Sequence, residues 1–192
     1  MSYDQPIANV TLLLASDSTH PPTEYEPPDG LLGANYSIPL LWLSLFSSVQ
    51  IVSWPGTLDA ASSYAAATGH RDTCITRSRS RLEEWKRRWP ETFNVLGPAW
   101  TDFIDARPEQ FLAIWTEELA EMSASAEEWL GTFRSHLEAL DEPDEPAFVE
   151  VLAQSYLEID ADGRRLAGTS EGPIGLLAGG YSWGVHAPWE TS

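Results

Sequence analysis

Cysteine is almost absent from this sequence, because Cys74 is the only one among 192 residues. A disulfide within the chain is therefore excluded, and so is a zinc site built from several cysteines. The histidines are also few, and none of the four stands in an H-x-x-x-H pair that would place two imidazoles on one helix face. We therefore predict that the protein holds no metal and no cofactor.

Long apolar segments are missing as well. The longest apolar run, IPLLWLSLF at residues 38–46, is far shorter than the roughly 20 residues that a membrane-spanning helix needs. The first residues, MSYDQPIANV, lack the basic and apolar regions of a signal peptide. We therefore expect a cytoplasmic protein that does not bind membranes.

Basic residues are scarce, since 11 of them stand against 29 acidic residues and the net charge is −18. Such a surface repels the phosphates of nucleic acids and attracts basic proteins. Seven of the 11 basic residues nonetheless lie in residues 71–88. Helical spacing there turns Leu82 and Trp85 inward and leaves Arg79 and Arg81 on the two flanks. We expect this basic helix to pack beside the acidic helices of residues 109–150 and to offset their self-repulsion.

Motifs typical of enzymes and calcium sites are incomplete. GYSWG at residues 180–184 matches the G-x-S-x-G pattern of a nucleophilic serine, but too few residues follow to supply a helix, an acid and a histidine. EIDADG at residues 158–163 lacks the glycine or the glutamate that a calcium loop needs at fixed positions. Cys74 follows His70 by four residues, but a single small cysteine at the start of a helix is usually a packing residue. The sequence therefore favours a non-catalytic protein.

Apolar patterns predict strands near the two chain ends. Residues 8–16 and 49–54 read as strands, and a hairpin is expected around Asp162 and Gly163. The glycine-rich residues 174–189 have interrupted strand character. Between the first two strands, four prolines make residues 17–30 a surface loop, because no helix can cross them.

Helical spacing dominates the middle of the chain. We expect a buried helix at residues 37–46, an alanine-rich helix at 57–69, and helices over most of 72–156. One apolar stripe, on a helix at 108–122, comprises Phe111, Trp115 and Leu119. We therefore predict an α+β fold in a single domain, residues 1–192, with a mainly helical layer packed on a small antiparallel sheet formed by the two chain ends.

The segment GLLGANYSIPLLWLSLF, preceded by a short apolar strand, resembles the opening of small uncharacterised bacterial proteins in which an AN-x-x-IPL-x-WL-x-LF helix follows the first strand. The resemblance lies in residues 31–46 and includes no catalytic residue. By its size and acidic charge the chain is also similar to immunity proteins of bacterial toxin systems. That similarity implies an inhibitor that binds a cognate effector.

We therefore expect an immunity-type protein that neutralises a basic toxin domain through an acidic surface. An enzyme or a small-ligand-binding domain, with its site between the sheet and the buried helix at 38–46, is the alternative. The candidate partner-binding residues are outward carboxylates on two predicted helices and two aromatic residues near the C-terminus: Glu117, Glu121, Glu127, Glu138, Trp183 and Trp189.

Overall fold

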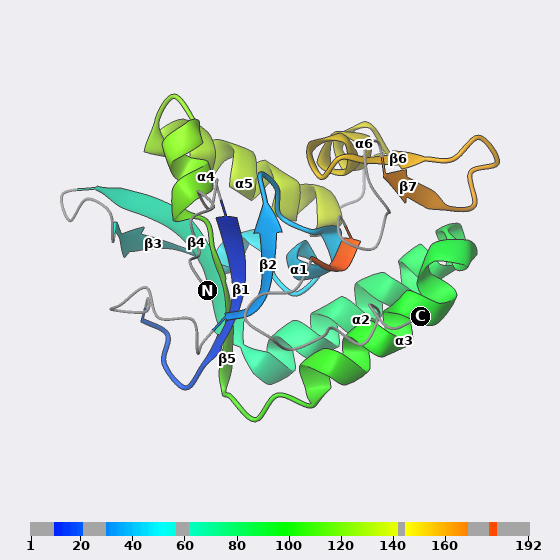
Figure 1. Cartoon of the computed structure of the whole chain (residues 1–192), viewed down its shortest axis with the longest axis horizontal. Helices are drawn as coiled ribbons and strands as arrows, with labels where there is room; N and C mark the ends of the chain where they lie inside the picture. The colour runs from blue at the N-terminus through cyan, green and yellow to red at the C-terminus, as the bar shows by residue number, and fades with distance from the viewer. Residues whose placement is uncertain (1–9, 21–29, 57–61, 142–144, 169–176, 180–192) are drawn as a thin grey trace, which may run out of the picture.

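The computed structural model describes residues 10–20, 30–56, 62–141, 145–168 and 177–179. Its main sheet has five antiparallel strands in the order β2-β1-β5-β4-β3, which confirms the α+β prediction (Figure 1). The strands are β1 (Val10–Ser16), β2 (Gly30–Asn35), β3 (Ile51–Pro55), β4 (Ser63–His70) and β5 (Phe111–Trp115).

The expectation that the two chain ends build this sheet is confirmed only in part. The N-terminal region supplies β1 and β2, whereas the other three strands come from further along the chain. Strands β6 (Leu157–Ile159) and β7 (Leu166–Gly168) form a separate two-stranded sheet. Gly163 lies in their turn with φ of 69°, so the predicted hairpin is confirmed. Of residues 174–189, for which strand character was predicted, the structure describes 177–179, and the prediction is wrong there because Leu177 and Ala178 are helical.

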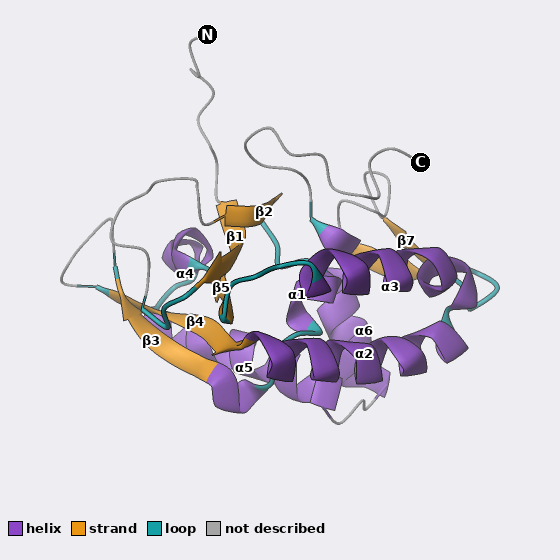
Figure 2. Ribbon diagram, turned by 90° about the horizontal axis from the view of Figure 1, so that it is seen from below, coloured by secondary structure: helices purple, strands orange, loops and turns teal. Residues whose placement is uncertain are grey.

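The helices pack mainly against one face of the sheet, where Leu13, Ala67 and Ile114 belong to the same apolar cluster as the helical side chains. Figure 2 shows α2 and α3 lying side by side, with α5 and α6 behind them in that view. The helices are α1 (Leu40–Leu43), α2 (Arg71–Arg88), α3 (Pro90–Asp105), α4 (Glu117–Met122), α5 (Ala126–Asp141) and α6 (Glu145–Gln154). None of those in the described part of the chain combines the length and the apolar character that crossing a membrane requires.

The predicted helix at residues 108–122 is wrong, because its first part is β5 and only Glu117–Met122 is helical. FLAIW is an unbroken apolar run, and a run this short fits a buried strand as well as a helix. Between β1 and β4, Ile114 faces the helices, whereas Ala113 and Trp115 join a second apolar cluster on the opposite face. Burial on both faces therefore decides the structure of this segment.

The predicted alanine-rich helix at 57–69 is also wrong, because Ser63–His70 forms β4. This strand lies between β3 and β5, so both of its edges are hydrogen-bonded. Its small side chains let α5 approach the backbone: the indole Nε1 of Trp129 lies 3.4 Å from the carbonyl oxygen of Ala65. The alanines therefore serve close packing of a helix on the sheet, which outweighs their helix propensity.

The buried segment after β2 contains a helix shorter than predicted. It spans only Leu40–Leu43 and is entirely buried. The carbonyl groups at its end accept hydrogen bonds from the basic helix α2, since Nη1 of Arg81 lies 2.9 Å from the oxygen of Leu43 and 2.6 Å from that of Phe46. Arg81 is 7% exposed, so the predicted flank position is wrong. Its guanidinium adds a donor for the carbonyl groups of Leu43, Ser44 and Phe46, at and beyond the end of α1.

The basic helix contacts the acidic helices through an aromatic pair, since the ring centroids of Trp85 on α2 and Phe148 on α6 lie 5.9 Å apart, but its more extensive contact is with α3. α2 lies along α3, and Arg79 pairs there with Asp105 at 3.0 Å. Arg77 reaches the side chain of Gln50, beyond the end of α1. Arg77, Arg79 and Arg81 of α2 thus act on the segment around the short buried helix and on α3.

Candidate functional site

The structure places three of the predicted partner-binding residues on the surface. Glu121 lies on α4, whereas Glu127 and Glu138 lie on α5, and all three are exposed. Eleven residues separate the last two, which on an α-helix corresponds to almost the same angular position. Trp183 and Trp189 lie outside the described residues.

The outward placement of Glu117 is wrong. Glu117 is the first residue of α4 and is only 2% exposed, because the chain leaves β5 immediately before it and the helix begins against the sheet. Burial, assisted by the negative charge of Glu117, raises the pKa of the Tyr64 hydroxyl, and a hydrogen bond with Trp115 opposes this shift. Glu117 and Glu121 therefore do not form an exposed pair, and Glu117 belongs to the interior.

Exposed carboxylates stand on the neighbouring helices α4, α5 and α6, and together they are called the acidic face. The neighbouring Glu118 is not part of it, because it is half-buried and its carboxylate accepts a hydrogen bond of 2.6 Å from the backbone N–H of Val10. The one exposed basic side chain on α5 is Arg134. The exposed carboxylates that define the acidic face are Glu121, Glu127, Glu128, Glu138 and Glu150.

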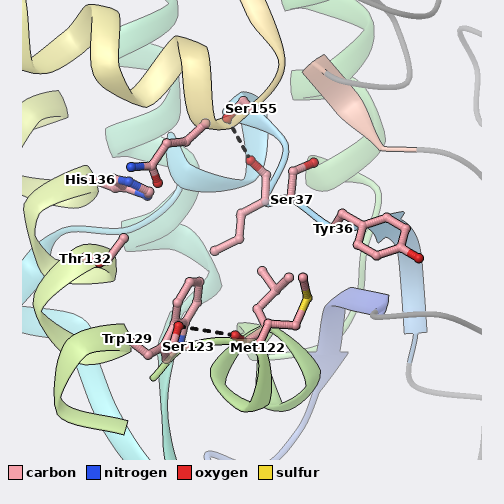
Figure 3. Close-up of a pocket in the computed structure, with 11 residues that line it drawn as sticks. Tyr36, Ser37, Met122, Ser123, Trp129, Thr132, His136 and Ser155 are labelled. Carbon is pink, nitrogen blue, oxygen red and sulfur yellow. Dashed lines mark hydrogen bonds between the residues drawn. The ribbon is translucent and has the colours of Figure 1, made fainter. Parts of the chain in front are cut away.

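Two pockets open beside the acidic face. The α4–α5 pocket has a volume of about 230 Å³ and lies between the start of the buried segment, α4, α5 and the end of α6; its rim includes the exposed side chains of Tyr36 and Met122 (Figure 3). The α5–α6 pocket has a volume of about 310 Å³ and lies between the two helices that name it. Both pockets are lined by Thr132, His136 and Gln154, so they are neighbours separated by these side chains.

His136 is the buried titratable group that the two pockets share. It is 9% exposed, and its Nε2 has no hydrogen-bond partner, although buried polar atoms in proteins nearly always have one. Burial lowers the pKa of His136, while a side-chain hydrogen bond with Gln154 and the charge of Glu150 act in the opposite direction. The imidazole is therefore neutral at neutral pH, and a neutral imidazole can accept a hydrogen bond on one nitrogen.

Sequence reasoning missed the role of His136 because the four histidines looked scattered. The available signal was its spacing: His136 follows Phe133 by three residues and Thr132 by four, so it lies beside the apolar stripe of α5 and not on its exposed side. Gln154 and Glu150 come from α6, and the sequence pattern of α5 cannot predict that these two residues lie beside His136. The pocket is therefore a product of helix packing.

The cysteine does not form a reactive site. The Cys74 side chain is fully buried, and its sulfur lies 3.7 Å from the Nε2 of Gln50. Burial raises the pKa of the thiol to about 11, against the weaker opposing effects of Gln50 and Arg77. A nucleophilic cysteine needs a thiolate and access to substrate, and Cys74 has neither. Among the described residues, no three His, Cys, Asp or Glu side chains gather as metal ligands do.

Comparison of the chain with protein-family models, with curated proteins and with solved structures gives no significant match. The fold and the two pockets therefore carry the functional argument by themselves.

Proposed function

We propose that this protein is a non-catalytic binding protein of the immunity type, which neutralises a basic toxin domain by binding it to the acidic face. The observation that carries the proposal is the row of exposed carboxylates on α4, α5 and α6 beside two pockets. Glu128 caps the start of α5 by accepting the N–H of Ala124, but the row as a whole is unfavourable for the fold, because carboxylates on one surface repel one another. A basic partner reduces that repulsion when it binds. The negative potential of the same carboxylates attracts the partner and speeds its association.

Exposed apolar side chains next to the acidic face favour a protein as the partner. Met122 is 55% exposed and Tyr36 is 46% exposed at the rim of the α4–α5 pocket. Methionine and tyrosine are enriched in protein interfaces, where they fill shallow hollows on the partner. In protein interfaces an apolar core is usually surrounded by a polar rim. Tyr36 and Met122 with the carboxylates of the acidic face beside them fit this arrangement.

The alternative, an enzyme or a small-ligand-binding domain, has one observation in its favour. The α4–α5 pocket lies against Tyr36, Ser37 and Ile38, where the alternative places its site. One hydroxyl of this pocket has a structural role, however, because Ser155 donates to the carbonyl oxygen of Ile38 at 3.1 Å. Neither His136 nor this hydroxyl is arranged as a base with its nucleophile, so we place binding ahead of catalysis.

The test begins with capture of the partner from an extract of the native host. The captured protein is purified, and its association with the wild-type chain and with the Glu121→Lys/Glu138→Lys variant is measured at low and moderate salt. We expect the double variant to associate at least about tenfold more slowly at low salt, with a flatter salt dependence, because steering acts on association. Expression of the captured protein alone should stop bacterial growth, and co-expression of this chain should restore it.

Glu83→Lys/Glu84→Lys provides the matched control, because both residues are exposed on α2 and the charge change is the same. This control should associate nearly as fast as the wild type. Equal slowing by both variants would show that net charge acts without a defined face. An association rate that neither variant nor salt changes would contradict the proposal.

A further inference from the structure

The α5–α6 pocket has a shape and a lining that suit one long side chain. Its volume of about 310 Å³ is at the lower end of the roughly 300–1,000 Å³ found for ligand pockets. Gly131 and Ala147 leave room in its walls, and a Cβ added at Gly131 would meet no atom within 4 Å. The pocket therefore opens widely enough for a side chain to enter between the two helices.

The lining of this pocket offers mainly hydrogen-bond acceptors. Glu150 supplies a carboxylate, and no lysine or arginine lines the pocket. The hydroxyl of Ser135 donates to the carbonyl oxygen of Gly131 at 3.0 Å, so its lone pairs point elsewhere and can accept. The side-chain amide of Gln154 also lines the pocket and forms a hydrogen bond with His136. A ligand with several N–H groups and a positive charge complements such a set.

His136 is an independent sign of a ligand at the same place. Its side chain is more than nine-tenths buried, lines the pocket, and leaves Nε2 without a partner within the protein. An unpaired polar atom at such a position is unfavourable unless a bound group completes it. The carboxylate of Glu150 on α6 and the unpaired imidazole nitrogen of His136 on α5 can both accept a hydrogen bond from one bound group.

We infer that the α5–α6 pocket receives a lysine or arginine side chain of the partner, whose cationic end pairs with Glu150 and donates a hydrogen bond to Nε2 of His136. This inference rests on the proposed function, because it assigns a basic protein as the partner of the acidic face. The acidic face by itself explains only how a basic partner is attracted. A basic side chain bound in the pocket would also hold the partner in place, since one buried residue can contribute a large share of the binding energy.

The probes are three short peptides: acetyl-Gly-Lys-Gly-amide, acetyl-Gly-Arg-Gly-amide and acetyl-Gly-norleucyl-Gly-amide. They are titrated into the isotopically labelled protein while NMR follows the amides of Gly131, Ser135 and Glu150 and the ring of His136. We expect saturable, millimolar binding of at least one cationic peptide and none of the norleucine peptide, which has a similar chain without charge. The two cationic peptides show whether lysine or arginine fits better. Equal shifts from all three peptides, or no saturable shift from any, would overturn the inference.

Two substitutions localise the binding. Gly131→Phe fills the pocket mouth and Gly131→Ala leaves it open, and both are expected to fold because a side chain at this position meets open space. Gly131→Phe should abolish the saturable shifts, whereas Gly131→Ala should keep them. Glu150→Gln retains the shape and should weaken cationic binding by about fivefold, as for a partly exposed ion pair. Unchanged binding to Gly131→Phe would show that the peptides bind elsewhere.

The pocket and the acidic face can fail separately. If Glu121→Lys/Glu138→Lys slows association but Gly131→Phe leaves the dissociation rate of the captured partner unchanged, the binding function stands and the anchor pocket is wrong. If the cationic peptides bind in the pocket while charge reversal leaves partner association unchanged, the pocket is a cation site and the acidic face is not the interface.

Discussion

Two arginines of α2 show how placement decides what a charge contributes. Arg81 is buried, and its Nη1 lies within hydrogen-bonding distance of the carbonyl oxygens of Leu43, Ser44 and Phe46. Arg79, two residues earlier, forms an ion pair with Asp105 in which both side chains are 52% exposed. The first charge replaces water around the end of a buried helix, whereas the second remains in water.

The substitution Arg81→Met should lower the free energy of unfolding by roughly 2–4 kcal/mol, because it keeps much of the apolar stem but leaves buried carbonyl groups without a donor. Urea unfolding at constant pH measures the change. Arg79→Met is the matched control and should cost at most about 1 kcal/mol, as exposed ion pairs do. Equal losses from the two substitutions would mean that Arg81 contributes by packing or by long-range charge, and not by closing the end of α1.

At the scale of elements, the short helix α1 is held from two sides. The indole N–H of its Trp42 donates to the carbonyl oxygen of Ala178 at 2.8 Å. Gly179 follows with φ of +82°, and a Cβ there would lie 2.5 Å from a ring carbon of Trp42. Residues 177–179 therefore close over α1 only because position 179 has no side chain.

Gly179→Ala should therefore reduce the free energy of unfolding by more than about 1 kcal/mol, since both the backbone conformation and the contact with Trp42 oppose the methyl group. Gly131→Ala is the matched control, because its Cβ points into open space within α5 and alanine favours a helix by about 0.8–1.0 kcal/mol. Thermal and urea unfolding of the two variants should shift in opposite directions. A neutral Gly179→Ala substitution would contradict this placement of residues 177–179 over Trp42.

The elements that the sequence predicts correctly are those with local signals. α5 lies in the region 72–156 where helices were predicted, and it begins after Ser125, whose hydroxyl accepts the N–H of Glu128 at 3.1 Å in an S-x-x-E cap. β4 and β5 were missed because their residues allow either structure, and pairing with distant strands decides between them. The prediction that Glu117 faces outward was wrong for the same reason. The residues before it form a strand and not a helix, so the side chains that face inward are different. Most of the acidic face was predictable, whereas the pockets depend on the packing of α5 against α6 and α4.

The whole molecule carries its negative charge unevenly. Residues 109–150 contain 12 acidic residues and one arginine, whereas α2 has seven basic residues and three acidic ones. α2 packs along α3, where Arg79 pairs with Asp105, and none of the ion pairs among the described residues joins α2 to the acidic face. The native state therefore bears a repulsion among these carboxylates that Arg134 offsets only in part, and unfolding relieves it by separating them.

This arrangement predicts a characteristic response to salt and to charge reversal. Raising NaCl from about 0.01 M to about 0.1 M shortens the screening length from about 30 Å to about 10 Å, so the melting temperature of the wild type should rise. Glu121→Lys/Glu138→Lys should raise the melting temperature at low salt and reduce this salt response, because it removes repulsion where carboxylates are dense. Glu83→Lys/Glu84→Lys makes the same change of net charge beside basic residues and should lower the melting temperature instead. If both variants stabilise the protein equally, the repulsion is spread over the molecule. If they differ as expected, the acidic face is retained at the expense of stability, as is common for surfaces that bind a partner.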